Sequence, residues 1–258
     1  MKFHQFGAGN PHSLMLIHGL ATTWQQSFGE VIPLLAENHH VIAVGLDGHD
    51  PAEHCEFATI AAAATSAADF VRTELDGHLN ALYAASLGCT VAVSMVIRDR
   101  IRVDRLVLDG AALPSFGVFT PPIAKLSAAL LYGATRGRYA SVLKVLGLAP
   151  QMRDRLMYGG VSRATITNGC REALTFLDML PPATHNPGTA VACWYGGREK
   201  LLVGTCLDTL REYFPDLEER PFPGYVHGEV LMHTDQFVAQ LEGFLAGRPP
   251  RLPADGFR

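Results

Sequence analysis

The chain has 258 residues, of which 48% are hydrophobic and 18% charged, and its formal net charge is −4. A chain of this length buries about three-quarters of its unfolded surface, so it needs no disulfide or metal to fold, and its composition excludes intrinsic disorder. The acidic balance argues against a nucleic-acid-binding protein, which needs clustered Lys and Arg, and against a membrane-surface protein.

Cysteine usage and the N-terminal segment bear on the cellular compartment. The five cysteines are odd in number, widely spaced and without a CxxC pair, which argues against a disulfide framework or a finger-type zinc site. His49, His54 and Cys55 lie close together, but no fourth ligand is near, so no metal site is expected. The apolar run 14–17 is too short for a signal-peptide core, and no stretch of about 20 apolar residues could span a membrane. We therefore expect a cytoplasmic protein.

Short apolar runs alternate with longer amphipathic or Ala-rich segments. The runs expected to form strands are 14–17, 41–44, 79–84, 106–108, 190–194 and, more weakly, 217–222. The segments expected to form helices include 57–75, 89–98 and 237–245. Apolar runs bounded by turn residues are typical of strands covered on both faces of a parallel sheet. This alternation therefore predicts an open α/β sheet.

Residues 113–187 interrupt the alternation, because they contain no clear strand. Helical patterns there cover 123–131, 139–146, 152–157 and 161–177, and prolines stand at both ends. We expect a helical insertion placed over one end of a core made of residues 1–112 and 188–247, followed by a Pro-rich tail at 248–258. Apolar residues of the insertion favour a hydrophobic substrate group, although each could simply pack helices together; they are Leu130, Leu131, Leu146, Leu148, Phe176 and Met179.

One serine lies between an expected strand and an expected helix. Ser86 has Ala84 two residues before it and Gly88 two residues after it. A sharp strand-to-helix turn that exposes a nucleophilic serine requires small residues at both positions, because strand and helix pass close together there. Ser86 is the candidate nucleophile, and the alternative is that it caps the following helix.

A serine nucleophile also needs two backbone N–H groups directed at the developing oxyanion. The N–H of Leu87, which follows Ser86 at the start of the helix, is one candidate. The N–H of Leu20, in the His18-Gly19-Leu20 loop after the first buried strand, is the other. The alternative for this loop is an ordinary turn that ends the strand.

The base and the acid are expected on later loops. His227 lies in a loop with a glycine three residues before it and another directly after it, and its ordinary pKa of about 6.5 suits a general base near neutral pH. A buried carboxylate must hold the imidazole tautomer. Glu199, at the end of the strand expected at 190–194, is the first candidate, and Asp109, at the end of the strand at 106–108, is the alternative. Either carboxylate could instead have only a structural role.

Together these residues resemble the α/β-hydrolase superfamily. The chain order Ser86, Glu199, His227 matches its order of nucleophile, acid and base. Residues 45–50 (GLDGHD) are similar to the family's D-x-P-G-H-G segment, with three substitutions, and GGREKLLV from residue 196 resembles its acid loop G-x-x-D-x-x-x-P, with Glu199 at the acid position.

The resemblance implies a mostly parallel sheet of about seven or eight strands flanked by helices, with one N-terminal strand near residues 2–6 and a helical cap at 113–187. It further implies a serine hydrolase of carboxylesterase type, which cleaves a small-molecule ester or related acyl substrate without a metal or organic cofactor. Two alternatives stay open. The same triad could serve C–C bond hydrolysis, a lyase or a thioesterase, or the protein could be a receptor-like binder with little turnover.

Overall fold

The computed structural model describes all residues except 51, 53, 112–115, 139–154, 184–187 and 248–258. Its described residues form one seven-stranded sheet in the order β1-β3-β2-β4-β5-β6-β7. The strands are β1 (Lys2–Phe6), β2 (Ser13–Ile17), β3 (His40–Gly45), β4 (His78–Ala85), β5 (Arg102–Asp109), β6 (Ala190–Gly196) and β7 (Glu218–Phe222). Only β1 runs antiparallel to its neighbour, which is β3. The expected mostly parallel sheet, with a single N-terminal strand at residues 2–6, is confirmed.

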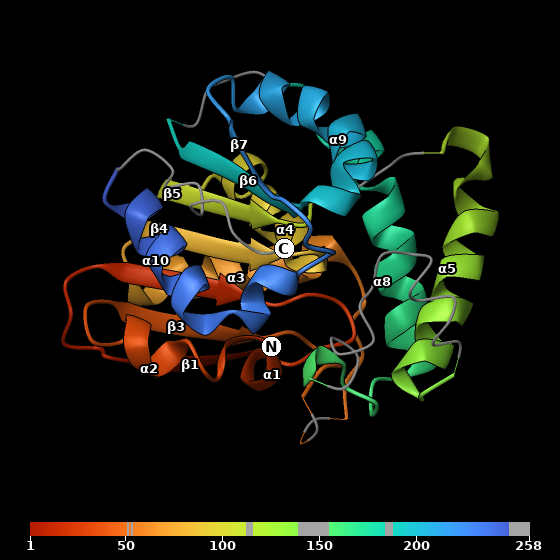
Figure 1. Ribbon diagram of the computed structural model, residues 1–258, viewed down its shortest axis with the longest axis horizontal. Helices are drawn as coiled ribbons and strands as arrows, with labels where there is room; N and C mark the ends of the chain where they lie inside the picture. Colours follow the sequence, from red (N-terminus) through yellow and green to blue (C-terminus); the bar gives the residue numbers. More distant parts are fainter. Residues whose placement is uncertain (51, 53, 112–115, 139–154, 184–187, 248–258) are drawn as a thin grey trace.

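Helices cover both faces of this sheet (Figure 1). The helices of the core are α1 (Trp24–Phe28), α2 (Ile32–Leu35), α3 (Ile60–Glu74), α4 (Leu87–Ile97), α9 (Lys200–Tyr213) and α10 (Thr234–Leu245). Consecutive side chains of β2 enter opposite cores: Met15 belongs to the core that also contains residues of α3, α4 and α9, and Leu16 to the core that contains residues of α1, α2 and α10. A strand buried on both faces has no polar alternation, which explains why β2 is a continuous apolar run.

The described residues between β5 and β6 form helices and no strand, as expected. Its described elements are η1 (Gly117–Phe119), α5 (Thr120–Thr135), α8 (Arg163–Thr175) and η2 (Leu177–Met179). The helical patterns at 123–131 and 161–177 correspond to α5 and α8. The pattern at 139–146 and the first half of that at 152–157 lie outside the described residues. We call residues 113–187 the insertion.

The insertion lies at the carboxyl ends of the parallel strands. The side-chain amide of Asn168 donates to the carbonyl of Phe57 at 2.9 Å. The backbone N–H of Tyr158 donates to the carbonyl of Ala21 at 2.8 Å. Both acceptors belong to loops that leave the sheet after β2 and β3, so the insertion covers the edge where ligands of open α/β sheets bind.

Candidate active site

Ser86 occupies a strained turn between β4 and α4. Its backbone has φ 52° and ψ −117°, a region that non-glycine residues rarely adopt. Its side chain makes no capping hydrogen bond to α4, which argues against the helix-cap interpretation. The turn is held instead by the backbone: the N–H of Ser86 donates to the carbonyl of Asp109 at 2.8 Å. Backbone strain of this kind persists where the surrounding structure fixes it, and is frequent at active sites.

The small residues around Ser86 are required by close packing. A Cβ on Gly88 would lie 2.6 Å from the carbonyl oxygen of Ile17, so α4 can cross β2 at this distance only with glycine there. Ala84, two residues before Ser86, is completely buried in the core. The spacing that singled out Ser86 in the sequence therefore has the expected steric cause.

The His18-Gly19-Leu20 loop lies directly against Ser86. A Cβ on Gly19 would lie 3.1 Å from Cβ of Ser86 and 3.7 Å from its Oγ. Among the described residues, none accepts a hydrogen bond from the backbone N–H of Leu20 or of Leu87. Both amides thus remain available as donors beside the serine.

His18 holds this loop in place from inside the core. It is fully buried, its Nε2 accepts from the N–H of Leu46 at 3.2 Å, and its Nδ1 lies 2.8 Å from the carbonyl of Gly19, to which it donates. Burial, and then the neighbouring His49, lower the pKa of His18 to about 3. The imidazole is therefore neutral and serves as a fixed donor and acceptor rather than as a base.

His227 and Glu199 are in direct contact. The Nδ1–H of His227 donates to Oε1 of Glu199 at 2.5 Å, and the second oxygen of Glu199 accepts from the N–H of Gly196 at 3.0 Å. Glu199 is only 6% exposed. Burial alone would lower the pKa of His227, but the adjacent Glu199 carboxylate outweighs it and raises the pKa to about 9. His227 thus departs from the ordinary value expected from the sequence, because its partner is a buried anion.

Asp109, the alternative acid, contacts a different group. It is 2% exposed, and its Oδ2 accepts from the hydroxyl of Tyr83 at 2.5 Å. Burial raises the pKa of Asp109 to about 7, an effect that the Tyr83 hydrogen bond partly opposes. The imidazole hydrogen bond goes to Glu199, so the geometry favours Glu199 as the acid.

Three supporting residues were not predicted from the sequence. Gly110 follows Asp109, and a Cβ there would lie 2.6 Å from Cε1 of His227, so the imidazole packs against its Cα. The N–H of Val226 donates to the carboxylate of Glu229 at 2.7 Å, which braces the loop that carries His227. Tyr83, which donates to Asp109, belongs to the apolar strand β4.

Of these three residues, only Gly110 could have been found from the sequence, because a glycine directly follows an Asp at the end of a predicted strand. The hydrogen-bond partners of Tyr83 and Glu229 depend on the tertiary fold.

Asp109 and Gly110 together contact both Ser86 and His227. The carbonyl of Asp109 accepts a hydrogen bond from the backbone N–H of Ser86. The imidazole of His227 packs against the next residue, Gly110. Because β4, β5 and β6 are neighbours, their carboxyl ends bring Ser86, Asp109 and the Glu199 turn to one place. The arrangement can therefore supply a nucleophile, a base with its orienting acid, and two amide donors.

Other kinds of site find less support. Among the described residues, no group of three or more His, Cys, Asp and Glu could hold a metal ion, and no helix is long and apolar enough to cross a membrane. All five cysteines lie in the described part of the chain, and none forms a disulfide.

The family follows from a comparison with known proteins. Residues 14–248 match the model of the alpha/beta hydrolase family. The chain belongs to the alpha/beta hydrolase family. The match includes the Ser86 turn, the insertion and the Glu199 and His227 loops, so the resemblance noted in the sequence is confirmed.

Solved structures share the fold along almost the entire chain. An alpha/beta hydrolase family protein from Desulfitobacterium hafniense is 24% identical, with a TM-score of 0.83, over 95% of this chain and 100% of that one. A structure from a study of carboxylesterases of Nitrososphaera gargenis is 17% identical, with a TM-score of 0.72, over 95% of this chain and 93% of that one. A thermophilic esterase from Thermogutta terrifontis is 14% identical, with a TM-score of 0.69, over the same shares. At these identities the likeness shows a shared fold alone.

Proposed function

We propose that this alpha/beta hydrolase is a serine hydrolase that cleaves a small or hydrophobic carboxylic ester, or a related acyl substrate, through an acyl-enzyme. Family membership supports a hydrolase. The observation that carries the finer proposal is the contact between His227 Nδ1 and Glu199, and it is supported by Ser86 in a strained, uncapped turn. A buried carboxylate that holds one ring nitrogen of a histidine leaves the other nitrogen available as a base.

The acylation step uses the groups in sequence. His227 Nε2 takes the proton of Ser86 as Oγ attacks the carbonyl carbon, and the N–H groups of Leu20 and Leu87 stabilise the oxyanion. His227 then gives that proton to the leaving alcohol, and the acyl group remains on Oγ. Glu199 holds the tautomer and stabilises the imidazolium throughout.

Deacylation repeats the same chemistry with water. His227 takes a proton from water, which attacks the acyl-enzyme, and returns the proton to Oγ of Ser86. The carboxylic acid leaves, and the site is restored. These steps need no metal or organic cofactor.

We further propose that the insertion acts as a cap that shapes the acyl pocket. Support comes from Gly169 of α8, where a Cβ would lie 2.6 Å from the side chain of Leu20. Of the apolar candidates for the pocket, Phe176 is buried, Met179 is 58% exposed, and Leu130 and Leu131 are half-buried. Leu146 and Leu148 lie outside the described residues.

We also propose that the protein is soluble and cytoplasmic.

The test is a substrate panel with the wild type and Ser86→Ala. The proposal predicts turnover of p-nitrophenyl esters, graded from acetate to decanoate, and its loss in Ser86→Ala. Preferred cleavage of thioesters, of diketones or of cyanohydrins would assign the same residues to thioesterase, C–C hydrolase or lyase chemistry. Cleavage that stops after about one equivalent would indicate a receptor-like binder.

A further inference from the structure

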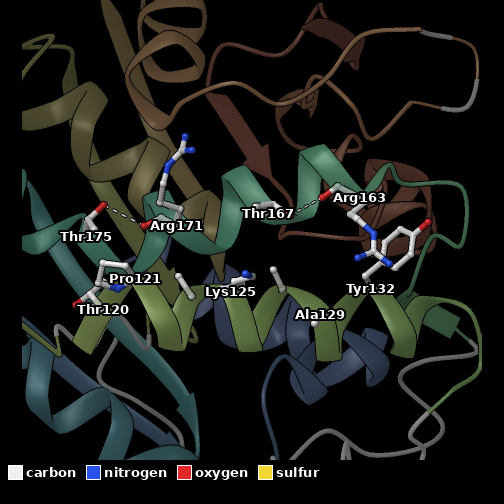
Figure 2. A pocket seen from close by; sticks show the side chains of 11 residues that line it. Thr120, Pro121, Lys125, Ala129, Tyr132, Arg163, Thr167, Arg171 and Thr175 are labelled. Atoms are coloured by element: carbon white, nitrogen blue, oxygen red, sulfur yellow. Dashed lines mark hydrogen bonds between the residues drawn. The ribbon is translucent and has the colours of Figure 1, made fainter. Parts of the chain in front are cut away.

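A groove runs along the insertion between α5 and α8 (Figure 2). Its volume is about 590 Å³, within the range of small-molecule pockets. The two helices pack along each other, and α8 separates α5 from the core (Figure 1). The exposed side chains of Lys125, Thr167 and Arg171 border the groove, so it opens to solvent on the outside of the molecule, apart from the Ser86 site.

The floor of the groove is apolar, and its side chains are small. Pro121, Ala124, Ala128 and Ala129 of α5 line it, and small side chains let a ligand approach the helix backbone. On α8, the hydroxyl of Thr167 donates to the carbonyl of Arg163 at 2.8 Å, and that of Thr175 to the carbonyl of Arg171 at 3.0 Å. These hydroxyls are satisfied within the helix, so they leave an apolar wall facing the groove.

The charges that border the groove are all positive. Lys125, Arg163 and Arg171 line it, and no acidic residue is among the described residues that do. Arg163 is engaged with the ring of Tyr132, at 4.6 Å from its centroid, and Arg171 has one contact of 3.3 Å with Glu172. In the described part of the chain, Lys125 has no ion pair. In Figure 2 it lies midway along the groove.

The charge of the insertion differs in sign from that of the rest of the protein. Residues 113–187 contain eight Lys and Arg against three Asp and Glu, a net charge of +5. The whole chain carries −4, so the remaining residues carry −9. A cationic groove on an otherwise acidic protein attracts anions to this one region.

We propose that the α5–α8 groove binds a free amphipathic carboxylate, such as a medium- or long-chain fatty acid. Its hydrocarbon chain lies over the alanine floor and its carboxylate pairs with Lys125, while Arg171 and Arg163 add to the positive potential. The Lys125 ammonium, which has no ion pair among the described residues, is a compact charge suited to one carboxylate, and the apolar floor of alanines favours a hydrocarbon chain over a polar body. Binding in the groove does not depend on the esterase proposal.

Fluorescence titration with 11-(dansylamino)undecanoate in 0.15 M salt tests this proposal. The wild type is expected to bind about one equivalent, and dodecanoate should displace the probe far better than dodecanol, which has no charge. Lys125→Glu should weaken binding at least tenfold. Ala129→Phe, which fills the groove without changing the charge, should also abolish binding. Circular dichroism confirms that each variant is folded.

The matched control is Arg102→Glu. Arg102 is exposed at the amino end of β5, away from the insertion, and its reversal changes the net charge by the same amount. Binding in this variant should stay within twofold of the wild type.

Three results would overturn the proposal: binding undiminished in Lys125→Glu, equal weakening in both charge reversals, or equal displacement by dodecanol and dodecanoate. Lys125-dependent co-sedimentation with phosphatidylglycerol vesicles, in a protein that does not bind dodecanoate, would replace the free carboxylate by a lipid surface. None of these readouts involves turnover, so they stand apart from the esterase test.

Discussion

Glu199 and Asp109 are two buried carboxylates at the ends of neighbouring strands, and they differ in what their oxygens contact. Glu199 accepts from His227, and Asp109 accepts from Tyr83. Only the former contact can set the imidazole tautomer, so the two residues should respond differently to removal of the charge.

The first prediction compares Glu199→Gln with Asp109→Asn. Glu199→Gln should lower turnover by about 10² or more, because a neutral amide no longer stabilises the imidazolium, and the analogous change in a serine protease costs about 10⁴. Asp109→Asn should cost much less. Turnover is measured with p-nitrophenyl acetate, and melting temperatures show that both variants fold. The reverse order would move the acid to Asp109.

The pH dependence of hydrolysis follows from the pKa of His227. The base must be neutral, so activity should rise with pH through a pKa of about 9 rather than the ordinary value of about 6.5. In Glu199→Gln, burial and the more distant Asp109 are the remaining influences on the pKa of His227. The pH midpoint of the residual activity should therefore fall by at least one unit. An identical midpoint in both proteins would show that Glu199 does not set the pKa of His227.

The protonation of Asp109 should affect the pH dependence of the protein's stability rather than the rate of hydrolysis. Its pKa in the folded protein is about 7, above the value of about 3.9 in an unfolded chain. The folded state therefore holds this proton more tightly, and the stability that it contributes is lost as pH rises from about 4 to about 7. Asp109→Asn does not titrate, so its melting temperature relative to the wild type should increase by several degrees between pH 4 and pH 8. A difference that does not change with pH would contradict the buried, uncharged Asp109.

At the scale of elements, the end of β5 joins the two halves of the site. Its last carbonyl, that of Asp109, fixes the Ser86 amide, and Gly110 supports the imidazole of His227. Gly110 has φ +64°, and a side chain there would be strained as well as in contact with His227. A single methyl group at this position therefore tests the packing of the base.

Gly110→Ala should lower turnover at least tenfold, because its Cβ would displace the imidazole. The matched control is Gly77→Ala: Gly77 has φ +72°, but a Cβ there would meet nothing within 4 Å. Both variants cost about 1–2 kcal/mol of backbone strain, and melting temperatures measured for both show that each is folded under the assay conditions. Equal turnover in the two variants would show that Gly110 has no role in placing His227.

The sequence predicted elements well where the physical signal is local. Runs such as 14–17 and 41–44 are apolar because both faces of the central strands are buried, and they became β2 and β3. Helix α9, which begins directly after Glu199 and follows a short 3-10 turn, was not predicted from the sequence. Its first residues, Lys200 and Leu201, are exposed, so the amphipathic pattern begins only later in the helix.

The sequence predicts the individual residues of the candidate site, but it does not predict which of them contact one another. Chain order and turn chemistry indicated Ser86, His227 and two possible acids. The choice between Glu199 and Asp109 depends on a distance between side chains 28 residues apart in sequence. Sequence spacing does not determine such a distance, because it results from the pairing of β6 with β7, the strands that precede Glu199 and His227.

At the scale of the whole molecule, the fold divides into an acidic core and a basic insertion around one edge of the sheet. The core fixes the strand ends that carry Ser86 and Glu199, and α8 of the insertion reaches the loop of Leu20. The proposed catalytic reaction and the proposed carboxylate groove thus belong to different surfaces of one fold. The proposed reaction requires Ser86 to be an activated nucleophile.

The most direct measurement is mass spectrometry of the protein after reaction with a fluorophosphonate probe. We expect one probe per chain, attached to Ser86, and little labelling in His227→Ala, because the hydroxyl then lacks its base. Ser94, which is buried on α4, and the other serines should remain unmodified. Labelling of another serine while Ser86 stays untouched would show that Ser86 is not the nucleophile.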